Sequence, residues 1–141
     1  MIDVAGVHKE FEEGRVRALR GCTLAVAAGE FVAVMGPSGS GKSTLLNLIG
    51  ALDLPTRGSV RVDGQDPGAR GDLDAFRART VGFVFQAFHL VPALSALENV
   101  MVPMVESPMR PSEQRRRAEA LLDRVGLLAR AHARPGVLSG G

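Results

Sequence analysis

The sequence predicts an α/β fold, and three consecutive segments carry that prediction. Residues 31–35 are an unbroken apolar run of the kind that forms a buried strand. A glycine-rich loop follows at residues 36–44, and residues 45–49 have the apolar character that suits the start of a helix. The order of buried strand, glycine loop and helix is the context in which the pattern G-x-x-x-x-G-K-[ST] binds phosphate.

The glycine loop predicts a site for the polyphosphate of a nucleotide. Its glycines let the backbone adopt positive φ angles and approach a ligand closely, so that successive N–H groups point into one concavity at the positive end of a helix. Lys42 is then placed to reach the β- and γ-phosphates, and the Ser43 hydroxyl to ligate the Mg²⁺ that bridges them. The predicted nucleotide-binding residues of the loop are Gly36, Pro37, Ser38, Gly39, Ser40, Gly41, Lys42, Ser43 and Thr44.

Composition bounds the size and the environment of the protein. The 141 residues amount to one domain or a piece of a larger one, and 45% hydrophobic residues suffice for a core. A net charge of +2, spread along the chain, does not indicate nucleic-acid binding. The single cysteine, Cys22, excludes an internal disulfide and suits a reducing compartment. Because the sequence shows neither a secretory signal nor a run of about 20 apolar residues, we expect a cytoplasmic protein that does not insert into a membrane.

The first half of the chain is predicted to contain strands, turns and two helices. Residues 2–35 are expected to form strands joined by turns. The helix after the glycine loop should end at Gly50, and residues 59–64 alternate as a short strand. A polar loop is then expected to lead into a short helix at residues 73–79.

Helix signals dominate the second half. Ser95 and Glu98 have the spacing of a capping box, which opens a short helix that Pro103 limits. Pro111 suits the first turn of a longer helix, which Gly126 should end.

Two side chains outside the glycine loop each allow two interpretations. Phe11, one of six aromatic residues, could pack within a strand or offer a flat surface on which a purine stacks. Gln86 follows residues 80–85, a nearly continuous apolar segment that predicts a second buried strand. Without further context, a polar residue at that point is simply where the strand reaches solvent.

The last residues of the sequence form a Leu-Ser-Gly-Gly segment that by itself could be a flexible tail. Together with the upstream glycine loop, this segment resembles the signature sequence of the ATP-binding subunits of ABC transporters. The residues that fall on the signature are Leu138, Ser139, Gly140 and Gly141. Residues 36–44 resemble the Walker A loop of these subunits, and the resemblance covers nearly the whole chain.

The resemblance implies roles for both ambiguous side chains. Gln86 is similar to the glutamine of the Q-loop, which reaches the Mg²⁺ and the γ-phosphate, so Ser43 and Gln86 become the implied Mg²⁺ ligands. Phe11 falls where the family usually places an adenine-stacking tyrosine, and phenylalanine keeps the stacking face while losing the hydroxyl.

The amino-acid sequences of three segments resemble those of one branch of this family. Residues 52–58, 82–86 and 98–100 are most similar to the branch that serves lipoprotein release, macrolide export and a related cell-division transporter. The transported substrate is not implied, since in this family selectivity lies in the membrane subunit.

The fold implied by the resemblance is a P-loop NTPase core with an N-terminal antiparallel β portion and a helical subdomain. Residues 1–86 would form the β portion and the P-loop core, and residues 87–141 the helical subdomain that ends at the signature. In the family, a strand ending in an Asp-Glu pair follows the signature and supplies the Mg²⁺-binding Asp and the Glu that polarises the attacking water. No run of four or more apolar residues in this sequence ends in an acidic pair. We therefore expect a partial ABC-type ATP-binding domain, truncated after the signature and without the C-terminal part of its core.

The function implied is that of an ATPase subunit that couples ATP binding and hydrolysis to transport. Its cofactors would be ATP and Mg²⁺. Its partners would be a membrane-spanning transporter subunit and a second ATP-binding subunit in a head-to-tail dimer, in which the signature meets the γ-phosphate held by the other subunit. The subunit would be peripheral on the cytoplasmic face of the inner or plasma membrane. Because the catalytic carboxylate is missing from the sequence, residues 1–141 are expected to bind ATP without turning it over.

Two other functions stay open at this point. A nucleotide kinase or GTPase could use the same loop, although no guanine-reading Asn-Lys-x-Asp occurs and the signature would be unexplained. The chain could also be a non-catalytic remnant that binds a nucleotide or a partner only, which the missing carboxylate pair would suit.

The missing strands also lead to an expectation about the fold. Without the rest of a parallel sheet to pack against, the apolar side chains of Val32, Val34, Val81 and Phe83 are expected to lack cover.

Overall fold

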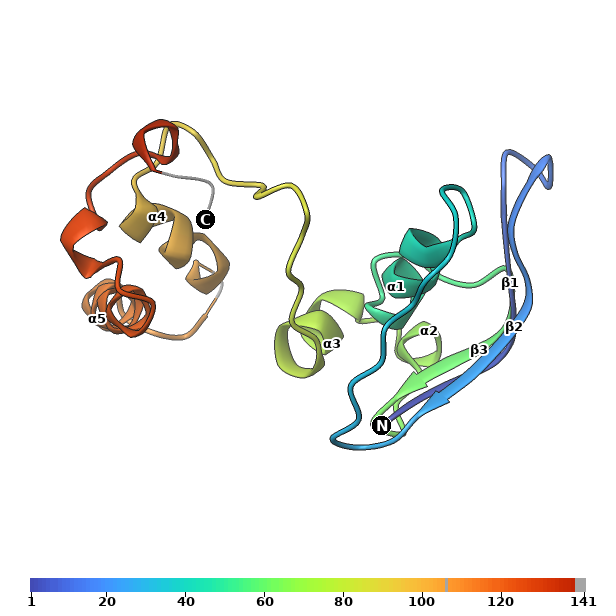
Figure 1. Ribbon diagram of the computed structural model, residues 1–141. Helices are drawn as coiled ribbons and strands as arrows, with labels where there is room; N and C mark the ends of the chain where they lie inside the picture. Colours follow the sequence, from blue (N-terminus) through green and yellow to red (C-terminus); the bar gives the residue numbers. More distant parts are fainter. Residues whose placement is uncertain (106, 139–141) are drawn as a thin grey trace. The chain divides into compact units, whose positions relative to one another are not determined.

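The computed structural model describes residues 1–105 and 107–138. The chain divides into two compact units, the first comprising Met1–Val84 and the second beginning at Phe85. The first unit contains a sheet and helices, and the second is helical (Figure 1). Each unit has its own cluster of buried apolar side chains.

A three-stranded antiparallel sheet organises the first unit. Strand β1 (Ile2–Phe11) lies between β2 (Val16–Val26) and β3 (Arg57–Val62), so the spatial order is β2-β1-β3 (Figure 1). The predicted strands in residues 2–26 and 59–64 are therefore confirmed, with β3 beginning at Arg57. Helix α1 (Lys42–Ile49) packs on this sheet, and the α/β prediction with an antiparallel N-terminal portion holds.

A bulge in β1 turns two valines toward the same core. Val4 and Val7 are both fully buried although they lie three residues apart, and the register with β2 and β3 shifts between them. Gly6 supplies the positive φ of +54° at this bulge. Gly58 of β3 approaches so closely that a Cβ there would lie 2.5 Å from the carbonyl oxygen of Gly6. Both glycines are thus required by the geometry of the sheet.

The P-loop helix α1 ends at Gly50, as predicted. The reason is space rather than an unusual backbone angle, since Gly50 has an ordinary φ of −81°. A Cβ at Gly50 would lie 1.8 Å from Cζ of Phe83, so the ring of Phe83 is seated against the end of the helix.

Two short helices complete the first unit. Helix α3 (Leu73–Thr80) is capped by Asp72 and buries Phe76, in agreement with the predicted helix. Helix α2 (Pro67–Arg70) stands where a polar loop was predicted. Its signal was Asp66 directly before a proline, because the Asp66 side chain accepts from two backbone N–H groups and proline suits the first helical position.

The two buried strands predicted at residues 31–35 and 80–85 are not formed, and this prediction is wrong. Residue 80 ends α3, and residues 31–35 and 81–85 have no regular secondary structure. Phe31 is 95% exposed and Val84 is fully exposed. An apolar segment becomes a buried strand only when strands pair with it on both sides, and among the described residues only β1, β2 and β3 belong to the sheet.

The expected lack of cover is correct for part of these segments. Val32 and Val34 are 39% and 38% exposed. Val81, by contrast, packs against the cluster of Ala51, Val62 and Phe76, and Phe83 is partly buried against Gly50. The second run thus finds cover without forming a strand.

In the part of the second unit that the structure describes, residues 85–105 and 107–138, there are two α-helices and short 3₁₀ turns. They are α4 (Ala96–Met101), η1 (Val102–Met104), α5 (Pro111–Arg124), η2 (Leu128–Arg130) and η3 (Pro135–Val137). Its apolar cluster is formed by Ala96, Leu97, Ala118, Leu122 and Ala131. Within the described residues, none of the helices has the length and apolar character needed to cross a membrane.

Helix termini in this unit follow the predicted signals. The Ser95 N–H donates to Oε2 of Glu98 at 2.7 Å, and the Ser95 hydroxyl accepts from the Glu98 N–H at 3.3 Å, which confirms the capping box of α4. Pro111 occupies the first turn of α5. Gly126, with a φ of +72°, follows the end of that helix.

Candidate nucleotide-binding site

The glycine loop leads directly into α1 and leaves the start of this helix open. Gly39 and Gly41 have φ angles of +80° and +89°, so both adopt the left-handed conformation that favours glycine. In the described part of the chain, no side chain caps the start of α1 and its first turn carries no acidic residue. The N–H groups of a helix start attract anions, so this end of α1 suits a phosphate group.

The positively charged ammonium of Lys42 is hydrogen-bonded to the backbone of the glycine loop. Its Nζ donates to the carbonyl oxygens of Gly36 at 2.9 Å and Pro37 at 2.7 Å, and lies 3.4 Å from Oγ of Ser40. The ammonium is therefore held over the loop by neutral acceptors. A polyphosphate at the loop would offer charged acceptors to the same three donors, and hydrogen bonds between charged groups are the stronger ones.

Gly41 fixes the end of the loop against the sheet. A Cβ at Gly41 would lie 2.6 Å from the carbonyl oxygen of Ala18 and 2.9 Å from Cδ2 of Leu19, both in β2. The position therefore needs glycine for space as well as for its positive φ. A hollow of about 330 Å³ lies beside this contact, and its lining includes residues of the loop, Leu19 and Cys22 of β2, and Leu45 of α1.

Phe11 lies on the same hairpin that supports the loop. It pairs with Val16 of β2, which is two residues, or about 7 Å along a strand, from Ala18. The residue is 40% exposed. The hairpin thus presents an accessible aromatic ring at one position and holds the phosphate-binding loop close by.

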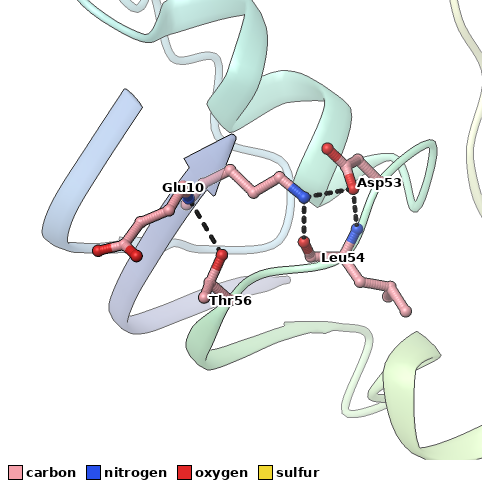
Figure 2. Close-up of polar contacts among 5 residues, drawn as sticks. Glu10, Asp53, Leu54 and Thr56 are labelled. Carbon is pink, nitrogen blue, oxygen red and sulfur yellow. Dashed lines mark hydrogen bonds and ion pairs between the residues drawn. The ribbon is translucent and has the colours of Figure 1, made fainter. Parts of the chain in front are cut away.

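The charged surroundings of Phe11 were not predicted from the sequence. Nζ of Lys9 lies 5.0 Å from the centroid of the Phe11 ring. The same Nζ is hydrogen-bonded to Asp53 and to the carbonyl oxygen of Leu54, in the loop after α1 (Figure 2). The only available signal was the rarity of lysine, since Lys9 and Lys42 are the only lysines among 17 lysines and arginines.

The remaining predicted site residues lie outside this first unit. Gln86 is exposed in an irregular segment of the second unit. Leu138 is partly buried against the apolar cluster of α4 and α5. Ser139, Gly140 and Gly141 lie outside the described residues. The structure therefore brings residues 36–44 and Phe11 together on one unit, whereas the roles of Gln86 and the signature stay predictions.

A magnesium site built from protein ligands alone is not found in the described part of the chain. No group of three or more His, Cys, Asp and Glu side chains is close enough there to hold a metal ion. The exposed Ser43 hydroxyl in the first turn of α1 fits a different kind of site, in which Mg²⁺ keeps several waters and is held by one or two protein oxygens and by phosphates.

Comparison with known proteins identifies the family. Residues 19–141 match the sequence family described as ABC transporter. This chain belongs to the ABC transporter family. The predicted resemblance of the chain to ATP-binding subunits of ABC transporters is thereby confirmed.

Relatives of this ABC transporter chain include ATP-binding proteins of known systems. It is 53% identical to the lipoprotein-releasing system ATP-binding protein LolD of Anaeromyxobacter dehalogenans, over 99% of this chain and 61% of that protein. It is 50% identical to the macrolide export ATP-binding/permease protein MacB of Chromobacterium violaceum, over 99% of this chain and 22% of that protein. The chain thus spans about three-fifths of the length of the first and about a fifth of the second. Two of the three transporter types in the predicted branch are represented.

A solved structure confirms the fold class. The chain superposes on a dimeric ATP-binding cassette bound to ADP and Pi with a TM-score of 0.85 and 41% identity, covering 99% of this chain and 64% of that one. The P-loop NTPase prediction is therefore confirmed at the level of the fold.

Proposed function

We propose that this chain is an ATP-binding subunit of an ABC transporter that binds Mg-ATP through residues 36–44. The observation that carries the proposal is the glycine loop at the open start of α1, with the Lys42 ammonium held over it by the carbonyls of Gly36 and Pro37. Lys42 would neutralise the β- and γ-phosphates and Ser43 would ligate the Mg²⁺. Phe11 would stack on the adenine. ATP, once bound, supplies the free energy that drives the transport cycle.

The remaining roles extend this proposal to the assembled transporter. Gln86 would complete the Mg²⁺ site, and residues 138–141 would meet the nucleotide of a second ATP-binding subunit in a head-to-tail dimer. Residues 1–86 would form the P-loop portion of the domain, and residues 87–141 its helical subdomain. The relative MacB is an ATP-binding/permease protein, and the similar solved cassettes are dimeric, which supports a membrane-spanning partner and a dimer. Through that partner the subunit would lie on the cytoplasmic face of the membrane.

Nucleotide binding is tested by ligand-induced stabilisation. Mg-ATP at about 100 times its dissociation constant should raise the free energy of unfolding by about 2.7 kcal/mol. Lys42→Ala should remove most of this gain, because the phosphates lose their point charge. Asn47→Ala, an exposed position on the same helix, is the matched control and should keep the gain. Equal stabilisation of the wild type and Lys42→Ala by ATP would refute the proposed site.

We further propose that the polypeptide of residues 1–141 binds ATP without hydrolysing it. The groups that neutralise phosphate are present in it, but a carboxylate that positions the attacking water is not apparent, and a general base contributes about 10²- to 10⁴-fold. Phosphate release by the purified polypeptide should stay at background. Fusion to the C-terminal half of a relative such as LolD should restore it. Lys42-dependent turnover by residues 1–141 alone would contradict this proposal.

The alternatives differ in their support. Membership of the ABC transporter family leaves a nucleotide kinase or a GTPase without support. A non-catalytic binding protein would differ from the main proposal in one measurement, since the LolD fusion would then remain inactive.

A further inference from the structure

Lys9 is the more buried of the partners in an ion pair that joins distant parts of the first unit. Its side chain is 12% exposed, and Nζ donates to Oδ1 of Asp53 at 2.6 Å and to the carbonyl oxygen of Leu54 at 2.9 Å (Figure 2). Oδ1 of Asp53 also accepts from the N–H of Leu54 at 2.7 Å. The loop that follows α1 is therefore folded around the ammonium of a residue in β1.

Two further hydrogen bonds join the same two segments, one to a backbone carbonyl and one to a side-chain hydroxyl. The N–H of Glu10 donates to Oγ1 of Thr56 at 3.0 Å (Figure 2). The N–H of Thr56 donates in turn to the carbonyl oxygen of His8 at 2.9 Å. The end of β1 is thus bonded at several points to residues 53–56. These bonds connect it, through the loop, to the end of the helix that begins at the phosphate-binding loop.

The ammonium that makes these bonds also faces the ring of Phe11. Lys9 and Phe11 are two residues apart in β1, and Nζ lies 5.0 Å from the ring centroid. A cation over the face of an aromatic ring is attracted by the electron density of that face, which favours one orientation of the ring. Since Nζ is itself held by Asp53 and Leu54, the ring is oriented relative to the P-loop helix and not only to its own strand.

We propose that Lys9 is a positioning residue for the nucleotide base, which it serves by holding the Phe11 ring in the orientation that stacks on the base. Lys9 covers one face of the ring, and the base contacts the other. This inference rests on the proposed function, because it requires ATP at the glycine loop. It assigns a function to the second of the two lysines, to which the sequence had assigned none.

The test separates the base from the phosphates by comparing two ligands. Dissociation constants of Mg-ATP and of magnesium tripolyphosphate are measured by calorimetry for the wild type, Lys9→Met, Phe11→Ala and the double variant. Phe11→Ala should weaken ATP binding by about fivefold or more and leave tripolyphosphate binding unchanged, because only the base stacks. Lys9→Met should weaken ATP binding selectively by roughly two- to fivefold. In the Phe11→Ala background Lys9→Met should cost nothing further, because Lys9 acts through the ring.

Two further variants complete the design. Arg17 is another cation of the β1–β2 hairpin, and its Nε lies 3.6 Å from Oε1 of Glu10. Arg17→Met should leave the dissociation constants of both ATP and tripolyphosphate unchanged. Lys9→Arg retains a cation that can face the ring, so this variant should keep most of the ATP affinity that Lys9→Met loses. If Lys9→Met does not fold, Asp53→Asn in the wild-type and Phe11→Ala backgrounds decides the question, with a smaller selective loss expected only when Phe11 is present.

Each outcome has a distinct meaning. Equal loss of ATP and tripolyphosphate affinity in Lys9→Met, or no loss, would overturn the positioning role. Unchanged ATP affinity in Phe11→Ala would overturn it as well, together with the stacking role of Phe11. A wild type that binds neither ligand would instead refute the proposed function.

Discussion

The two units of the chain are stabilised by contacts of different sequence separation. In the first unit, β1 pairs with β3, so that Ile2 lies opposite Val62. In the second, α4 begins with a cap whose partners, Ser95 and Glu98, are three residues apart. Pairing of distant strands requires a long loop to close, whereas a cap forms within one helical turn. Because each unit also has its own apolar cluster, we expect a substitution to destabilise the unit that contains it.

The largest effect is expected from Leu48→Ala in the first unit. Leu48 is 1% exposed and belongs to the cluster that joins α1 to the sheet, so its truncation should lower the free energy of unfolding by about 2–5 kcal/mol. Leu46→Ala is the matched control on the same helix, because Leu46 is 51% exposed and its loss should cost less than about 0.5 kcal/mol. Urea denaturation measures both values. Hydrogen exchange of α5 should be the same in both variants, and faster exchange there in Leu48→Ala would show that the units do not respond separately.

A smaller effect is expected from Ser95→Ala in the second unit. The Ser95 hydroxyl accepts from the N–H of Glu98, and loss of such a cap costs about 1 kcal/mol. Faster hydrogen exchange in α4 with unchanged exchange in β1 and β3 is the expected result. Ser112→Ala, at an exposed position in the first turn of α5, is the control. A change confined to the sheet would contradict the division into units.

The smallest effect concerns pH. The backbone N–H and the hydroxyl of Ser95 donate to the Glu98 carboxylate and lower its pKa below the ordinary value of 4.5. A pKa that is lower in the folded state means that the stabilisation is present above the unfolded value and is lost as the pH falls through the folded value. The stability of the second unit should therefore decline below about pH 4.5. An NMR titration should show the pKa of Glu98 rising part of the way toward its ordinary value in Ser95→Ala, which keeps the backbone N–H, and an unchanged pKa would contradict the contribution of the hydroxyl.

Several predictions that the structure confirms depend on residues that lie close together in the chain. The glycine loop with α1, the capping box of α4 and the ends of α5 follow from neighbouring residues. Sequence reasoning failed at residues 31–35, because apolar character alone does not supply a pairing partner. Helix α2 was missed because four residues are too few for an apolar period.

The same distinction between neighbouring and distant residues applies to the candidate site. The loop itself could be recognised from its glycines and Lys42, which are consecutive or nearly so. The contact of Lys9 with Asp53 joins residues 44 apart, and no local pattern predicts which loop returns to β1. The roles of Gln86 and of residues 138–141 depend on the family resemblance alone, because they would act on ligands and subunits beyond their own unit.

The ring of Phe83 against Gly50 has a consequence for how this sequence can drift during evolution. The two positions share one volume, since any side chain at residue 50 would occupy the space of the ring. A larger residue at position 50 is tolerable only after the aromatic at position 83 has been replaced by a smaller one, because enlarging residue 50 first causes a collision, whereas losing the ring first only leaves a cavity at the end of α1. Residues 50 and 83 are therefore expected to covary among relatives, with the loss of the ring as the permissive first step.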